Sequence, residues 1–214
     1  MFRFAPALMA AAFAARPQLI YAQQQLKISL ETESTIDPAT RTSFPNMLSI
    51  RSTQHRLLGV GVRRVTFLRF HTYAAGIYTK LNDQKTFPSP AALVETSSSL
   101  VLRLVPVRNT NGSHLQAAMS RMLQSKQPTL MQEDPSYKEA CDQFAATFPK
   151  TSVSKGTEML FVKQGGVLWT YCDGRETGCI DHPVLADTFF SAFVADEPAL
   201  IPELKQQLEV NLEQ

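Results

Sequence analysis

The sequence predicts an α+β domain in which an antiparallel sheet carries helices on one side. Residues 48–80 are rich in Val, Ile, Phe, Tyr and Thr, which favour strands. Two short strand-like runs, 158–163 and 167–171, flank Gln164-Gly165-Gly166, a typical hairpin sequence. Helical spacing of apolar residues dominates between and after these runs. Hairpin-linked strands without regular βαβ alternation indicate antiparallel pairing with segregated helices.

The first strands contain a candidate cross-strand pair. Arg63 and Tyr73 are equally distant in sequence from Leu68. If the chain reverses near 67–69, their Cβ atoms become neighbours at about 4.5–5.5 Å. Residues 100–107 predict a further, largely buried strand that Pro106 interrupts near its end.

Four helices are predicted from N-terminal signals. They begin after Asn111, after Asp134, after Asp181 and at Pro202. Asn and Asp cap helix N-termini with their side-chain oxygen atoms, and Pro suits the first turn. Apolar residues follow each start at helical spacing, so each helix should bury one face.

Length and charge indicate one folded domain with an N-terminal extension. The chain has 214 residues, 44% of them hydrophobic, and 13 phenylalanines. Domains usually contain about 100–200 residues. The 21 Lys and Arg nearly balance the 19 Asp and Glu, and no basic block occurs. Because nucleic-acid binding needs a concentrated basic surface, the composition predicts no nucleic-acid partner.

The N-terminus resembles a targeting segment. Residues 1–15 are an Ala-rich apolar run, Arg16-Pro17 interrupts it, and no acidic residue precedes Glu31. The run is too short and too charged for a bilayer span. A mitochondrial transit segment is favoured over a secretory signal and a weak membrane anchor. The polar segment 31–46 predicts a linker, so residues 1–45 are assigned to leader and linker and 46–214 to the domain.

The chain lacks the short sequence motifs that mark several classes of enzyme. Gly59-Val60-Gly61 lacks the third glycine of a dinucleotide site and is interpreted as permitting a bend. The chain contains no G-x-S-x-G, H-E-x-x-H or P-loop lysine motif. Its three cysteines include no C-x-x-C pair and its four histidines are scattered, so no zinc site is predicted.

Candidate binding residues are basic side chains near the predicted sheet and helix. A strand arginine such as Arg63 needs a carboxylate, phenolate or backbone partner unless it is exposed, which is commoner. The arginines that compete for this role are Arg64, Arg69 and Arg103. His114 and Arg121 lie on one flank of the helix after Asn111, roughly 110–130° from its apolar face. The pattern alone favours solvent exposure for both.

A family resemblance spans most of residues 46–214. The segment 57–79, LLGVGVRRVTFLRFHTYAAGIYT, resembles the opening of the chalcone-isomerase-like family, with its Gly-Val-Arg element and Ala-x-Gly-Ile-Tyr strand. Residues 104–115, LVPVRNTNGSHL, and 156–212 resemble later blocks of the family. The Val-Pro-Val-Arg-Asn-Thr and His-Leu pieces of the first block are most similar to the fungal mitochondrial branch. The resemblance implies an open-faced β-sandwich, a long antiparallel sheet backed by a layer of helices with a cleft between them.

The resemblance also implies site residues. In the plant enzymes an arginine steers the chalcone while a threonine and a tyrosine organise water at its ketone. Arg63 matches that arginine, whereas the threonine position falls on Tyr73, the tyrosine position on about His114, a neighbouring asparagine on Arg121 and a last hydroxyl near Ser191. Electrostatic organisation at the ketone is usually the largest catalytic contribution, and most of its members are replaced.

Arg63 with Tyr73 resembles the fatty-acid-binding branch, in which such a pair holds a carboxylate. Some relatives are associated with haem, which would make His114 an axial ligand and Arg63 or Arg121 a propionate partner. The predicted function is therefore a mitochondrial, non-catalytic binder of an apolar carboxylate, fatty acid or haem, in the sheet–helix cleft. No cofactor is required in this interpretation. The alternatives are a chalcone-isomerase-type lyase with a flavonoid-like ligand, then a structural scaffold. Inner-membrane association through the N-terminal segment is a further expectation.

Overall fold

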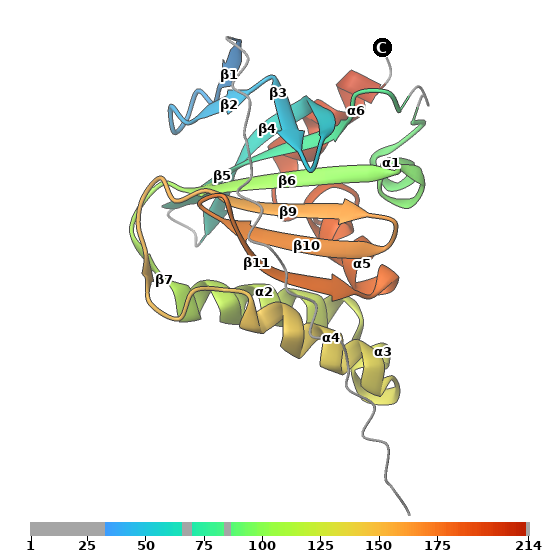
Figure 1. Cartoon of the computed structure of the whole chain (residues 1–214). Coiled ribbons are helices and arrows are strands. Elements are labelled where there is room, and N and C mark those ends of the chain that lie inside the picture. The colour runs from blue at the N-terminus through green and yellow to red at the C-terminus, as the bar shows by residue number, and fades with distance from the viewer. Residues whose placement is uncertain (1–32, 66–69, 84–86, 213–214) are drawn as a thin grey trace, which may run out of the picture.

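A seven-stranded antiparallel sheet forms the centre of the molecule (Figure 1). The computed structural model describes residues 33–65, 70–83 and 87–212. In spatial order the strands are β11 (Arg175–Asp181), β10 (Val167–Cys172), β9 (Met159–Gln164), β6 (Ser99–Pro106), β5 (Phe70–Lys80), β4 (Thr53–Val65) and β3 (Met47–Ile50). Every neighbouring pair is antiparallel, which confirms the predicted sheet.

Six helices are present among the described residues: α1 (Pro90–Thr96), α2 (Gly112–Lys126), α3 (Pro128–Glu133), α4 (Pro135–Ala146), α5 (Pro183–Val194) and α6 (Pro202–Leu212). The four predicted helices are confirmed. Asn111 Oδ1 accepts from the Ser113 backbone N–H at 2.9 Å, and Asp134 caps α4 in the same way. The cap of α5 is His182 rather than Asp181. None of these helices in the described ranges is long and apolar enough to span a membrane.

The helices lie together on one face of the sheet. In Figure 1, α5 and α6 lie behind the strands, and α2 to α4 lie along the β11 edge. The main core fills the space between α5 and the sheet, with Phe189 and Phe193 fully buried. On the other face, Leu48 and Ile50 of β3 pack with Tyr78 and with residues of the distant strands β9 and β10, because the sheet curls. The predicted α+β class is confirmed.

Two small two-stranded elements complete the fold. One pairs β1 (Ser34–Ile36) with β2 (Ser43–Pro45), and the other pairs β7 (Thr110–Asn111) with β8 (Ser152–Val153). Phe44 of β2 is fully buried against the sheet beside Gly76. Residues 33–45, predicted to be a linker, are therefore part of the ordered body, which begins before residue 46. The predicted leader lies in residues 1–32, outside the described part of the chain.

The Gly-x-Gly element of β4 makes room for α6. A Cβ atom built on Gly61 would lie 2.7 Å from Ile201 Cγ2 and 3.0 Å from the Leu204 backbone nitrogen. The first distance is shorter than real Cβ atoms show and the second is tighter than most, so a side chain at residue 61 would force α6 away from the strand. These glycines therefore allow close helix–strand packing, a role that the predicted bend did not include, and the β4–β5 register shifts between Leu57 and Gly59.

Candidate functional site

Arg63 and Tyr73 are direct cross-strand partners in the β4–β5 ladder. This pairing confirms the prediction from their equal spacing around Leu68, although the reversal itself lies in residues 66–69, outside the described ranges. Directly opposed residues project from the same face of a sheet. Tyr73 belongs to the main core between sheet and helices, so both side chains lie on the helix-covered face.

The Arg63 guanidinium is held by the connection between α5 and α6. Its Nη1 donates to the Leu200 carbonyl oxygen at 2.7 Å, and the Leu200 N–H donates to the Ala192 carbonyl at 2.9 Å. A guanidinium carries five N–H donors, so this bond leaves most of them for another acceptor. Because Arg63 is half-buried, those donors lie at the rim of the core rather than fully in solvent.

The competing arginines already have acidic partners. Arg64, next along β4, forms an ion pair with Glu203 of α6. Arg103 Nε lies 2.6 Å from Glu158 Oε1, and its Nη1 donates to the Ser43 carbonyl. Arg69 is outside the described residues. Among the arginines considered, Arg63 is thus the one in the described chain that is bonded only to a backbone carbonyl.

Tyr73 offers a neutral phenol beside this guanidinium. Only 6% of the residue is exposed. Burial raises the pKa of its hydroxyl well above the usual range, although the nearby positive charge of Arg63 acts in the opposite direction. At neutral pH the phenol is therefore protonated and can donate a hydrogen bond. Together, Arg63 and Tyr73 present donors that can converge on one carboxylate.

His114 and Arg121 do not join this pair. Both are exposed on α2, as the helical pattern predicted, and no hydrogen bond among the described residues links them to Arg63 or Tyr73. Because His114 is exposed, its side chain does not face the interior, as an axial ligand of a bound haem would have to. Within the described ranges, no group of three or more His, Cys, Asp or Glu could hold a metal ion. The positions implied for haem are thus not supported by the structure.

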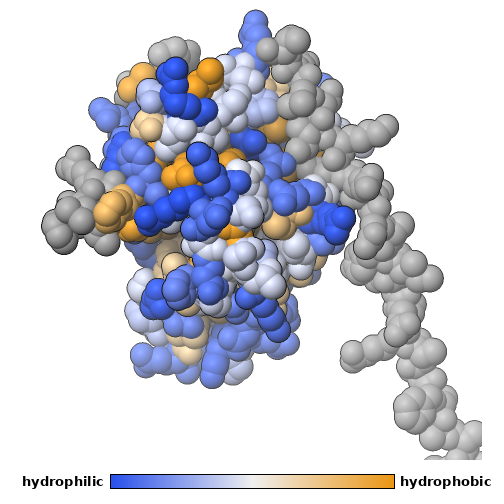
Figure 2. All heavy atoms as spheres, turned by 90° about the vertical axis from the view of Figure 1, so that its left-hand side faces the viewer, coloured by the Kyte–Doolittle hydropathy of each residue, from blue (hydrophilic) through white to orange (hydrophobic). Residues whose placement is uncertain are grey.

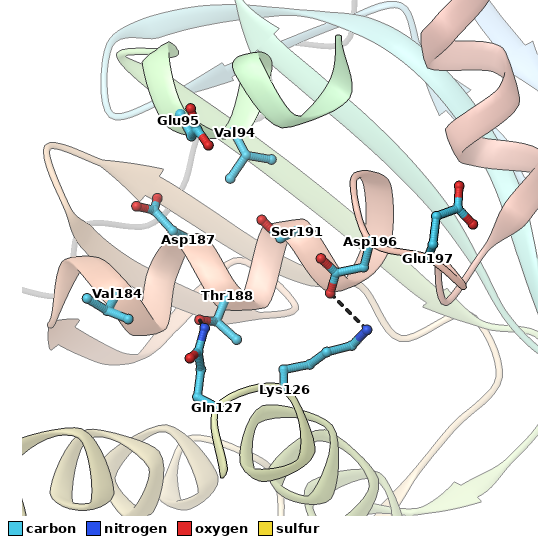
Figure 3. A pocket seen from close by; sticks show the side chains of 10 residues that line it. All are labelled: Val94, Glu95, Lys126, Gln127, Val184, Asp187, Thr188, Ser191, Asp196 and Glu197. Atoms are coloured by element: carbon cyan, nitrogen blue, oxygen red, sulfur yellow. Dashed lines mark hydrogen bonds and ion pairs between the residues drawn. The ribbon is translucent and has the colours of Figure 1, made fainter. Parts of the chain in front are cut away.

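Ser191 lines a separate pocket of about 450 Å³ between α1, α5 and the end of α2 (Figure 3). The lining residues are Val94, Glu95, Lys126, Gln127, Val184, Asp187, Thr188, Ser191, Asp196 and Glu197. Neither Arg63 nor Tyr73 is among them. The structure therefore brings together two of the five predicted residues and places Ser191 in a different hollow.

Ion pairs compensate most of the charge around this pocket. Lys126 Nζ lies 2.9 Å from Asp196 Oδ2 (Figure 3). Asp187 contacts the buried Lys163, and Glu197 contacts Lys205. Since three of the four lining carboxylates have lysine partners, the pocket has no strong preference for a charged ligand.

The surface around the end of the β4–β5 hairpin is mainly hydrophilic. Figure 2 shows this side of the molecule with hydrophobic residues in small, separate areas among its coloured atoms. Phe70, at the start of β5, is 49% exposed, and Arg108 lies over its ring. Single exposed apolar residues of this kind are normal on soluble surfaces. The coloured surface on this side of the molecule is therefore mainly polar.

No sequence motif could have predicted two features of the site. The Leu200 carbonyl is a backbone group 137 residues from Arg63, so residue types do not signal it. Phe193, whose ring centroid lies 6.5 Å from that of Tyr73, follows Phe189 at helical spacing. That spacing predicts a buried face but not which strand residue it meets.

Sequence and structure comparisons place the chain among known proteins. The family model described as "Chalcone isomerase like" matches residues 53–91 and 89–208. The Saccharomyces cerevisiae "Altered inheritance of mitochondria protein 18, mitochondrial" is 24% identical over 228 residues, covering 83% of this chain and 69% of the yeast protein. Its Lachancea thermotolerans namesake is 23% identical, with 83% and 72% coverage.

Two further matches cover different shares of this chain. An uncharacterized Schizosaccharomyces pombe protein is 31% identical over 118 residues, and the match spans only 44% of each protein. The crystal structure of an Arabidopsis thaliana fatty-acid binding protein superposes with a TM-score of 0.65, at 19% identity, over 84% of this chain and 97% of that one. This likeness shows the shared fold. With the family model covering well over half of its length, the chain belongs to the chalcone-isomerase-like family.

Proposed function

We propose that this protein is a non-catalytic mitochondrial binder of a carboxylate with an apolar body, held between Arg63 and Tyr73. The cross-strand pairing of these two donors at the edge of the main core carries the proposal. A guanidinium and a phenol can both donate to one carboxylate, and charge-assisted bonds of this kind are strong. The Arabidopsis protein of the same fold is named a fatty-acid binding protein, which supports this ligand class.

The mitochondrial location rests on two observations. The yeast relatives carry "mitochondrial" in their names. The first 30 residues of this chain contain Arg3, Arg16 and Lys27 and no acidic residue, as transit segments do.

The positions of His114 and Arg121 favour binding over cyclisation of a chalcone. A lyase of the plant type needs donors that organise water at the substrate ketone. The tyrosine position falls on the exposed His114, the neighbouring asparagine position on the exposed Arg121, and the threonine position holds Tyr73. The same exposure favours a fatty-acid-like ligand over haem, because an axial ligand must face the bound group.

Arg63→Ala tests the carboxylate site, with Arg64→Ala as its matched control. We expect Arg63→Ala to bind octanoate about tenfold to a hundredfold more weakly than the wild type, since it loses charge-assisted bonds. Arg64 pairs with Glu203 instead, so Arg64→Ala should keep wild-type affinity. Titration calorimetry of the full chain measures both, and circular dichroism verifies folding.

Two results would contradict the proposal. Equal octanoate affinity for the wild type and Arg63→Ala would show that Arg63 does not bind the carboxylate. A wild-type protein that accelerates chalcone cyclisation above the buffer rate, followed by absorbance, would replace the non-catalytic assignment with the lyase.

A further inference from the structure

A continuous aromatic cluster occupies the core next to Tyr73. The Phe193 centroid lies 6.5 Å from that of Tyr73 and 5.2 Å from that of Phe189. Phe189 in turn lies 4.8 Å from Phe161 of β9 and 5.3 Å from Phe144 of α4. All four phenylalanines are at most 2% exposed. These separations are those of rings in contact.

This cluster obstructs the path of a ligand that enters at Arg63. A carboxylate bound to the half-buried guanidinium and the Tyr73 hydroxyl must direct its alkyl chain either to solvent or toward the core. Phe193 is the core ring that pairs with Tyr73, so an inward chain meets it first. Protein interiors are close-packed, and displacing one ring of an interlocked cluster disturbs its neighbours.

We propose that Phe193 is a specificity-determining residue that limits the ligand to short-chain carboxylates. This inference rests on the proposed function, because it concerns the same site. An alkyl chain directed inward from Arg63 and Tyr73 meets the buried Phe193 ring, and the part of a long chain that cannot pass it stays in solvent. Only the buried methylenes then add to affinity, at about fourfold each.

A chain-length series tests the role of Phe193. Butanoate, octanoate, dodecanoate and hexadecanoate are titrated into the full-length wild type, Phe193→Ala and Phe148→Ala by calorimetry. We expect wild-type affinity to rise from butanoate to octanoate and then stay constant within about threefold. Phe193→Ala should continue to gain affinity through dodecanoate, because the removed ring leaves room for further methylenes.

Phe148→Ala is the matched control. Phe148 contacts Phe144 and Phe161 at the other end of the cluster. Phe148→Ala therefore removes a ring of the same size far from Tyr73. Its chain-length profile should equal that of the wild type. Where circular dichroism shows that Phe193→Ala does not fold, Phe193→Leu takes its place, with a smaller shift in the same direction.

The outcomes separate this inference from the proposed function. Wild-type affinity that keeps rising through hexadecanoate, or an equal shift in Phe148→Ala, overturns the role of Phe193 while Arg63-dependent binding stands. Octanoate binding that Arg63→Ala leaves unchanged overturns the proposed function and this inference together, as does failure of every acid to bind.

Discussion

The two ends of the β4–β5 hairpin both hold polar side chains in a buried setting, but they differ in how completely these side chains are bonded. At one end, His55 is 1% exposed, and its two ring nitrogens lie 3.1 Å from the Thr53 carbonyl and 2.9 Å from Ser99 Oγ. At the other end, Arg63 uses one of its donors, and the Tyr73 hydroxyl makes no hydrogen bond among the described residues. A buried polar group whose hydrogen bonds are all made within the protein stabilises the fold. Donors without a partner, next to an apolar core, can instead bind a ligand.

Further bonds reinforce the His55 end. Ser97 Oγ lies 3.2 Å from Thr79 Oγ1 and donates to Asp83 Oδ2 at 3.0 Å. A buried network in which every member is bonded rigidifies the fold and is costly to disrupt. Changes at the His55 end should therefore alter stability, and changes at the Arg63 end should alter binding.

The largest expected effect is the pH dependence of stability that His55 causes. Burial lowers the pKa of His55 from 6.5 to about 4. Between these values the unfolded state binds the proton more readily, so the free energy of unfolding should fall by about 3 kcal/mol as the pH drops from 6.5 to 4. Urea unfolding across this range measures the loss, which should be absent from His55→Gln.

His114→Gln serves as the control, because His114 is exposed. Its stability should follow the wild-type pH profile throughout. Parallel profiles for the wild type and His55→Gln would mean that His55 is not held neutral by its surroundings.

Ser99→Ala should have the next largest effect. It removes the partner of the His55 Nε2 atom and leaves a buried polar group unbonded, at a cost of about 1–3 kcal/mol in the free energy of unfolding. Ser98→Ala, at the exposed neighbouring position, loses only 3.3 Å contacts with Asp83 and should change stability by no more than about 0.5 kcal/mol. Urea unfolding at pH 7 compares the two. Equal losses would show that the His55 network is no more important than the adjacent surface.

The smallest effect on stability is expected for Tyr73→Phe. Its hydroxyl has no hydrogen-bond partner in the described chain, so its removal should change the free energy of unfolding by less than about 0.5 kcal/mol. Octanoate affinity should nevertheless fall about tenfold, because one donor to the carboxylate is lost. Thermal unfolding and calorimetry give the two numbers.

Tyr78→Phe is the control for this change, since Tyr78 Oη is buried without a partner and lies in the cluster on the other sheet face. It should leave octanoate binding unaltered. A loss of stability well above 1 kcal/mol in Tyr73→Phe would indicate that its hydroxyl has a structural role, which removes the contrast between the two hairpin ends.

Local signals predicted much of the fold and one contact of the site. The caps at Asn111 and Asp134 and the register that pairs Arg63 with Tyr73 follow from short-range patterns, and the structure confirms them. The helices α1 and α3 were not predicted, because seven and six residues carry too little periodicity. Residues 33–45 were mistaken for a linker, since Pro38 and Pro45 outweighed the single buried Phe44 as a signal.

The sequence by itself determined the strands, the main helices and the neighbourhood of Arg63 and Tyr73, because caps, periodicity and hairpin register depend on residues close together in the chain. Only the tertiary structure decided which polar groups are bonded. The Leu200 carbonyl reaches Arg63 because α6 packs closely on β4 at Gly61, and His114 and Arg121 point away because α2 buries its opposite face. These outcomes depend on the packing of distant elements, and local sequence patterns do not encode such contacts.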